Sequence, residues 1–142
     1  MSEIDFAAFD ALTFDCYGTL IDWETGIERA LRAALPPRDP APGTDELLES
    51  FARHEAAAEA GPYLTYRQVL ARAAEGICAD LGLEPDPDGI RAFSSSVPDW
   101  PAFADTPAAL RRLAGRFRLG VITNCDDDLF AATNRRLGMT FD

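Results

Sequence analysis

The residue with the clearest potential for chemistry is Asp15, which ends a short apolar run, Ala11 to Asp15 (A-L-T-F-D). A carboxylate at the end of a buried strand is well placed to act as a nucleophile or as a metal ligand. The loop that follows contains Tyr17, Gly18 and Thr19, which offer backbone N–H groups and a hydroxyl to an anion. The alternative is structural, with Asp15 capping the turn that follows the strand.

A second apolar run, Phe117 to Thr123, ends in a hydroxyl and is followed by Asn124. An acidic stretch, Asp126 to Asp128, comes next and has two interpretations. It could form a Mg²⁺ cluster with Asp15. The favoured interpretation is that the acids complement the dipole of a helix that begins there.

The two apolar runs predict strands, and the segments between them predict helices. Helices are expected from about Thr25 to Leu35, from an N-cap at Thr44, from Thr65 to Leu81, from about Ile90 to Phe93, from an N-cap at Thr106, and after Asp128 to about Leu137. Strands joined through helices run parallel and lie side by side. Ligands bind beyond the carboxyl ends of such strands, so Asp15 and Thr123 are predicted to converge on one site.

This order of elements predicts an α/β protein. Its core is expected to be a Rossmann-like, doubly wound parallel sheet that is incomplete, with about two strands, formed by residues 1–22 and 100–142. Residues 23–99 are expected to form an inserted helical unit. Two strands are fewer than an independent sheet requires.

Composition narrows the classes of partner. The chain has 142 residues and a formal net charge of −11, and all 13 of its basic residues are Arg. So acidic a surface repels phosphate backbones, which disfavours nucleic acid as a partner. No apolar run reaches the roughly 20 residues of a membrane span, and residues 1–11 lack the basic region of a signal peptide. We therefore expect a soluble, cytoplasmic protein with no membrane partner.

Two segments resemble motifs of the haloacid dehalogenase superfamily. Leu12 to Trp23 (L-T-F-D-C-Y-G-T-L-I-D-W) is similar to the first motif, and Leu119 to Asn124 (L-G-V-I-T-N) is similar to the second. Tyr63 to Leu83 resembles a cap helix of the type II 2-haloacid dehalogenases. The resemblance covers nearly the whole chain in order and implies that residues 23–99 are the cap.

The resemblance implies a role for each matched residue. Asp15 would be the nucleophile, and Thr19 would hold its carboxylate. The implied substrate contacts are Cys16, Tyr17, Thr123 and Asn124, of which Thr123 and Asn124 would bind a carboxylate at a helix N-terminus. Asp15 would attack the carbon that bears the halogen of a short 2-haloalkanoic acid, and water would hydrolyse the ester to a 2-hydroxy acid. No metal or cofactor takes part.

Tyr17 bears on the alternative of a Mg²⁺-dependent phosphatase of the same superfamily. Those phosphatases usually have a second Asp at this position, which protonates the leaving alkoxide. Tyr, with a pKa near 10, is a poor acid at neutral pH, whereas a halide leaves without a proton. Tyr17 therefore favours dehalogenation, with loop packing as its structural alternative.

The superfamily has two further motifs, a third with Lys or Arg and a fourth with an acidic cluster, and no residue after Asn124 matches either. We therefore expect the N-terminal part of a dehalogenase-like protein, with little activity by itself. A non-catalytic fragment that folds with a partner or as a homodimer is the other hypothesis.

A cap Arg receives the halide in type II dehalogenases. Arg53 and Arg67 are the candidates here, and the sequence does not assign the role to either of them. The only histidine, His54, is expected to be solvated.

Overall fold

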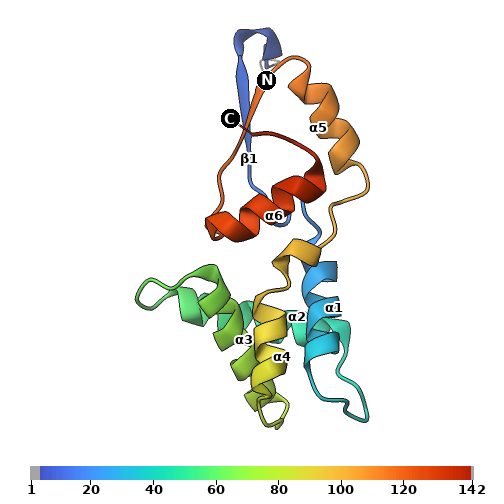
Figure 1. Cartoon of the computed structure of the whole chain (residues 1–142), viewed down its shortest axis with the longest axis vertical. Coiled ribbons are helices and arrows are strands. Elements are labelled where there is room, and N and C mark those ends of the chain that lie inside the picture. Colours follow the sequence, from blue (N-terminus) through green and yellow to red (C-terminus); the bar gives the residue numbers. More distant parts are fainter. Residues whose placement is uncertain (1–3, 142) are drawn as a thin grey trace.

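The computed structural model describes residues 4–141. Its elements in chain order are η1 (Phe6–Ala8), β1 (Ala11–Phe14), α1 (Trp23–Ala34), α2 (Thr44–Glu59), α3 (Tyr66–Asp80), α4 (Pro87–Ser94), η2 (Val97–Asp99), α5 (Thr106–Ala114), β2 (Arg118–Val121) and α6 (Asp127–Leu137). Figure 1 shows an elongated molecule, with the strands and α5 at one end, α1 to α4 at the other, and α6 between them.

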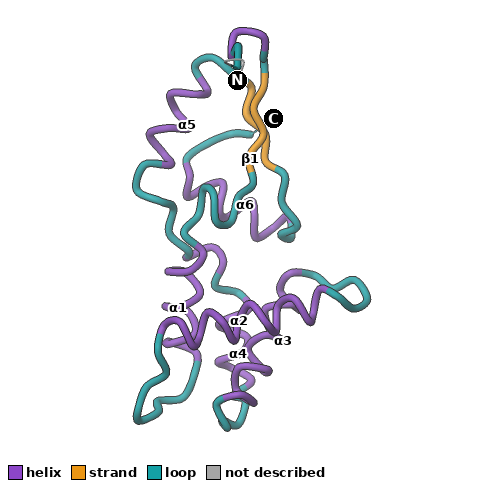
Figure 2. Tube along the Cα trace, turned by 180° about the vertical axis from the view of Figure 1, so that it is seen from behind, coloured by secondary structure: helices purple, strands orange, loops and turns teal. Residues whose placement is uncertain are grey.

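The two strands pair in parallel, as predicted. Leu12 is opposite Leu119 and Phe14 is opposite Val121, and the pairing continues past the strands because Ile122 N donates to Phe14 O at 2.9 Å. Figure 2 shows the two strands side by side from the other direction. The carboxyl ends of both strands therefore lie at the same edge of the sheet.

Successive side chains of each strand point to opposite faces of the sheet, and one of these faces is buried. Leu12, Phe14 and Leu119 pack into the hydrophobic core, together with residues of α5 and α6. Thr13 and Ile122 lie on the other side, where Ile122 keeps 71% of its surface exposed. The sheet is thus covered on one face in the described residues, whereas parallel sheets in complete domains are covered on both.

The helical end is built from α1 to α4, with α2 packed on α3 and α3 on α4. Phe51 of α2 meets Phe93 of α4 edge to face, with the ring centres 6.2 Å apart. α2 and α3 approach closely because Gly76 lacks a side chain: a Cβ there would lie 2.3 Å from Nδ1 of His54. The architecture confirms the predicted α/β fold with two parallel strands and a helical insertion.

Three helix starts differ from the predictions. Thr44 and Thr106 are first helical residues and not N-caps, since Gly43 and Asp105 precede those helices. The Thr44 hydroxyl instead donates to Glu28 Oε1 at 2.6 Å, which a sequence pattern does not reveal. The helix expected from Ile90 begins at Pro87, because Asp86 accepts bonds from the amides of Asp88 and Gly89.

The expected division into a core of residues 1–22 and 100–142 and a helical unit of residues 23–99 stays a prediction. α1 does begin at Trp23, and η2 ends at Asp99. Residues 1–3 and 142 lie outside the described part of the chain. Within that part, no helix is long and apolar enough to cross a membrane.

His54 was expected to be solvated, and the structure corrects this. Its ring is only 26% exposed and lies 2.9 Å from Asp80 Oδ2. Ser50 and Arg53 donate to the same oxygen at 2.6 and 2.7 Å. A carboxylate at the C-terminal end of a helix is destabilised by the helix dipole, and the three hydrogen bonds stabilise its negative charge. They hold the pKa of Asp80 well below its usual value, with the Ser50 bond the largest cause.

This cluster predicts an acid-dependent contribution to stability. Because the pKa of Asp80 is lower in the folded than in the unfolded chain, its stabilisation is present above the unfolded pKa and is lost as the pH falls through the folded pKa. We expect Asp80→Asn to lower the melting temperature at pH 7, and we expect its difference from wild type to shrink below about pH 4. Thermal unfolding followed by circular dichroism from pH 7 to 2.5 measures this. Asp45→Asn on α2 is the control, and a difference that is constant with pH would contradict the prediction.

Candidate active site

Asp15 lies directly beyond β1, with its side chain exposed. The Thr19 hydroxyl donates to Asp15 Oδ2 at 3.0 Å, which orients one oxygen and leaves the other free of protein bonds within the described residues. The loop between them turns tightly, because the Cys16 carbonyl accepts from the amides of Thr19, Leu20 and Ile21. Gly18 has a φ of +102°, a conformation that favours glycine. The D-C-Y-G-T segment thus exposes the Asp15 carboxylate, with one of its oxygens bound by the Thr19 hydroxyl.

Cys16 and Tyr17, both predicted to contact substrate, differ in burial. Cys16 is fully buried, and this burial raises the pKa of its thiol to about 12. Tyr17 is half-buried, and its hydroxyl lies 3.0 Å from Thr133 Oγ1. Burial raises the pKa of Tyr17 well above its usual value, so the phenol is neutral at physiological pH. This agrees with the sequence argument that Tyr17 is a poor acid.

Thr123 and Asn124 follow β2 at the same edge of the sheet as Asp15. The Thr123 hydroxyl accepts from the amide of Cys125 at 3.3 Å. Asn124 is predicted to bind the carboxylate of a substrate, and one N–H of its Nδ2 donates to Glu59 Oε1 of α2 at 3.1 Å. The loop after β2 therefore reaches the helical end of the molecule.

A cavity of about 310 Å³ lies where the two ends of the molecule meet. It is lined by Tyr17, Trp23, Glu55, Glu59, Tyr66, Asn124 and Cys125. Its place beside the ends of both strands is where parallel α/β folds bind their ligands. Asp15 does not line the cavity itself, but Tyr17, two residues further along the same loop, does. We take the cavity, together with Asp15, as the candidate active site.

Two carboxylates in this cavity were not predicted from the sequence. Glu55 and Glu59 are four residues apart on α2, so they share one face of the helix. Glu55 accepts from the Tyr66 hydroxyl at 2.8 Å. Burial raises the pKa of Glu55, and the negative charge of Glu59 acts in the same direction. A sequence signal could have found them, because Glu55 and Glu59 continue the i, i+4 row of Leu47 and Phe51, the apolar residues of α2 that are buried.

Asp126 has a role that neither sequence interpretation anticipated. It precedes α6 but makes no side-chain bond to the amides of that helix. Its two oxygens accept from the amides of Tyr66 and Arg67 at 2.8 and 3.1 Å, at the first turn of α3. A residue of the loop after β2 therefore caps α3, 60 residues away in sequence. Asp127 and Asp128 do lie in the first turn of α6, where acids complement the dipole.

The two candidate halide ligands have separate partners. Arg67 binds Asp128 at 2.5 Å and Ser95 at 3.2 Å, so it joins α3 to α6 and to the end of α4. Arg53 pairs with Asp80 within the helical end. Neither arginine lines the cavity.

The contacts of Asp126 predict a measurable change on substitution. Asp126→Ala removes the acceptor of two helix N-terminal amides, a loss of about 1–2 kcal/mol of stability. The amides of Tyr66 and Arg67 are expected to exchange with solvent faster, as measured by NMR. Asp127→Ala is a matched control, since Asp127 makes no side-chain bond to the rest of the described chain. Unchanged exchange at Tyr66 and Arg67 would contradict the capping role.

Candidate metal ligands were sought over residues 4–141. No three His, Cys, Asp or Glu side chains there come together as a metal site. In the acidic stretch after Cys125, Asp126 accepts from the amide of Tyr66 and Asp128 accepts from the guanidinium of Arg67, both of α3.

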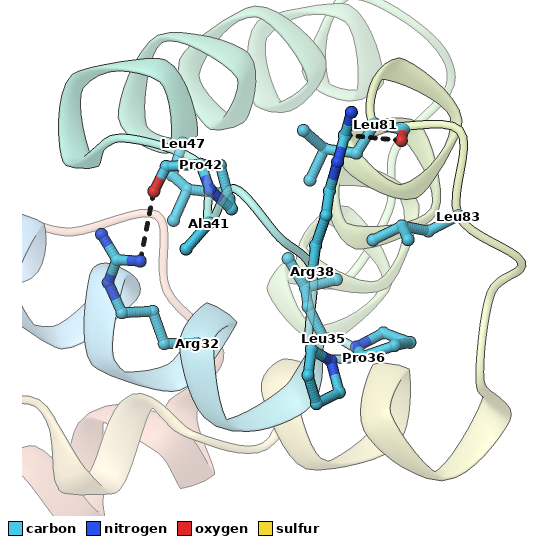
Figure 3. Close-up of a pocket in the computed structure, with 10 residues that line it drawn as sticks. Arg32, Leu35, Pro36, Arg38, Ala41, Pro42, Leu47, Leu81 and Leu83 are labelled. Atoms are coloured by element: carbon cyan, nitrogen blue, oxygen red, sulfur yellow. Dashed lines mark hydrogen bonds between the residues drawn. The ribbon is translucent and has the colours of Figure 1, made fainter.

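A second cavity lies in the helical end and is lined by no residue of either strand; Figure 3 shows its lining. It has a volume of about 200 Å³, and its wall consists mainly of prolines and leucines from the segment after α1, from α2 and from the segment after α3. The two arginines in its wall donate hydrogen bonds to backbone carbonyls, Arg38 to Leu81 O at 2.7 Å and Arg32 to Pro42 O at 3.2 Å. Its described lining contains no carboxylate or hydroxyl that could carry the reaction, so we do not place the site there.

Comparison with known proteins identifies the class of fold. No family model matches the chain, and no curated protein matches it by sequence. Solved structures do match. One L-2-haloacid dehalogenase superposes with a TM-score of 0.78 and 20% identity, over 94% of this chain and 60% of that one. The L-2-haloacid dehalogenase of Xanthobacter autotrophicus superposes with a TM-score of 0.76 and 24% sequence identity, over 94% of this chain and 55% of that one.

A HAD-type hydrolase from Bacillus subtilis, described as bound to magnesium, matches with a TM-score of 0.71 and 16% identity, over 92% of this chain and 60% of that one. The chain thus has the fold of the haloacid dehalogenase superfamily, as the sequence resemblance implied. It spans about 55–60% of the length of these three structures.

Proposed function

We propose that this chain carries the nucleophile of a hydrolase and that the reaction is hydrolytic dehalogenation of a short 2-haloalkanoic acid. The observation that supports it is the position of Asp15 beyond β1, with Oδ2 held by Thr19. The likeness of fold to L-2-haloacid dehalogenases supports the choice of reaction.

The chemistry has two steps. In the first, the free oxygen of Asp15 attacks the carbon that bears the halogen; the carbon–oxygen bond forms as the carbon–halogen bond breaks, and the halide leaves with the bonding electrons. In the second, water attacks the ester carbonyl, which releases the 2-hydroxy product and a proton and restores the carboxylate. Thr19 keeps Asp15 oriented in both steps.

The neutral phenol of Tyr17 supports a leaving group that needs no proton. An alkoxide leaving a phosphate ester has to be protonated, whereas a halide does not. Tyr17 lines the cavity, and its burial raises its pKa, which keeps it neutral at physiological pH. Dehalogenation is therefore favoured over the phosphatase alternative, in which Mg²⁺ would be the cofactor.

Halide release from 2-chloropropionate by the purified chain, with the intact mass recorded during incubation, tests the proposal. Release of chloride, or a mass increase located on Asp15 that marks the trapped ester, is the expected result. A folded chain with neither chloride release nor an adduct would overturn it. Hydrolysis of a phosphate ester that EDTA abolishes would instead support the phosphatase.

A further inference from the structure

The second cavity, in the helical end, carries positive charge in a wall that is otherwise mainly apolar (Figure 3). We infer that it binds a short aliphatic carboxylate, with the carboxylate on Arg38 and the alkyl chain on the leucines of the wall. The inference goes beyond the proposed function and does not rest on it, because this cavity shares no lining residue with the candidate active site.

The charge in the wall comes from two arginines, and only one of them has an acidic partner. Arg32 pairs with Glu28 at 3.0 Å. No carboxylate of residues 4–141 pairs with Arg38, and none of them lines the cavity. The charge of Arg38 is therefore available to an anionic ligand.

Arg38 also retains hydrogen-bond donors for such a ligand. A guanidinium has several N–H donors, and the described contacts of Arg38 use a single one, the bond from Nη1 to Leu81 O at 2.7 Å. Figure 3 shows the side chain extended from the 36–43 loop to Leu81. The two oxygens of a carboxylate match two parallel N–H groups of a guanidinium, so a carboxylate fits the remaining donors.

The rest of the wall favours an aliphatic group. Leu47 and Leu81 are buried, Leu35 and Leu83 are half-buried, and all four line the cavity. An alkyl chain that displaces water from these leucines removes apolar surface of both partners from water, which is favourable. A phosphate or a halide ion would gain nothing from such a surface. The anion is therefore expected to carry an alkyl chain.

Prolines and backbone hydrogen bonds hold this wall in place. Pro36 and Pro42 are among the lining residues, and the ring of proline fixes φ. The bond from Arg38 to Leu81 O connects the 36–43 loop to the segment after α3. The bond from Arg32 to Pro42 O connects the same loop to α1. Because the wall is fixed before a ligand arrives, binding costs little conformational entropy.

The volume of the cavity limits the length of the ligand. Its value of about 200 Å³ is below the roughly 300–1,000 Å³ of sites for drug-sized ligands. Hexanoate, with about eight non-hydrogen atoms, is a probe of suitable size. Hexan-1-ol and hexylamine have the same alkyl chain with a neutral and a positively charged head group.

Binding of these three compounds to the full chain, followed by NMR, tests the inference. The probes are the backbone amides of Leu47, Leu81 and Leu83 and the Nε–H of Arg38. We expect hexanoate to bind at least about fivefold more tightly than hexan-1-ol, because it adds a charge-assisted hydrogen bond, and hexylamine to bind more weakly than either. Equal binding of hexanoate and hexan-1-ol, or no shift at these probes up to about 20 mM hexanoate, would overturn the inference.

Substitution of Arg38 identifies the cation. In Arg38→Gln the preference for hexanoate over hexan-1-ol is expected to fall to within about twofold, whereas Arg38→Lys keeps the charge and should retain a preference of about threefold or more. Arg72→Gln is the matched control, because Arg72 is exposed on α3 and does not line the cavity. A preference that persists in Arg38→Gln, or that is lost in Arg72→Gln, would contradict the role of Arg38. The comparison of the three compounds on the wild-type chain does not depend on the folding of any variant.

The position of the shifts separates this cavity from the candidate active site. Hexanoate is expected to shift the amides of Leu81 and Leu83 at lower concentrations than the indole N–H of Trp23 and the side-chain amide of Asn124, which line the other cavity. The reverse order would overturn the inference. Halide release from 2-chloropropionate without hexanoate binding at Leu81 and Leu83 would support the proposed function and overturn this inference.

Discussion

Asp15→Asn is expected to lower halide release to the background of the assay. The amide of asparagine is a far weaker nucleophile than a carboxylate. Thr19 can still donate to the side-chain oxygen of the asparagine, so the loop is expected to keep its geometry. Chloride release from 2-chloropropionate, measured beside the wild-type chain, gives the ratio.

The same variant should also remain unmodified in intact-mass measurements, because the covalent intermediate forms on the missing oxygen. Asp10→Asn, at the other end of β1, is the control for a general loss of charge and should behave as wild type. Activity that survives in Asp15→Asn would show that another group performs the attack, and the site would have to be reassigned.

Gly26→Ala is expected to destabilise the fold by about 2 kcal/mol, although alanine is the better helix former. A Cβ at Gly26 of α1 would lie 2.4 Å from Cγ of Trp100. Trp100 is 1% exposed and donates through its indole N–H to Ser96 Oγ at 3.0 Å, so it has little room to move. The steric overlap therefore outweighs the gain in helix propensity, which is about 1 kcal/mol.

The effect should extend to the candidate site, because Tyr17 packs edge to face on Trp100 with the ring centres 5.7 Å apart. Denaturant unfolding gives the loss of stability, and the NMR shifts of Tyr17 give the displacement. Gly115→Ala is the matched control, because Gly115 has a φ of −69° and a Cβ there would make only an ordinary contact. Equal stability of the two variants would contradict the packing argument.

Local patterns were enough to predict the two strands that precede Asp15 and Thr123. The apolar runs before Asp15 and Thr123 predicted two parallel neighbouring strands, and the register confirms them. Thr65 was predicted to start a helix and does cap it, because its hydroxyl bonds the amide three residues on, a contact within one turn. Thr44 and Thr106 failed as predicted caps because the residue before each takes that position.

By itself, then, the sequence determined the two strands and the helices between them, since each depends on neighbours within a few residues. The resemblance to the superfamily implied the Asp15–Thr19 pair, whose hydrogen bond the structure contains. Tertiary structure alone decided the charge of the site. Glu55 and Glu59 line the cavity because α2 packs on α3 in an orientation that turns these two residues toward the ends of the strands. Asp126 became a cap for α3 because folding brings residues about 60 apart into contact. Such pairings depend on how helices are oriented against each other, which follows from the packing of the whole core and leaves no short-range pattern in the chain.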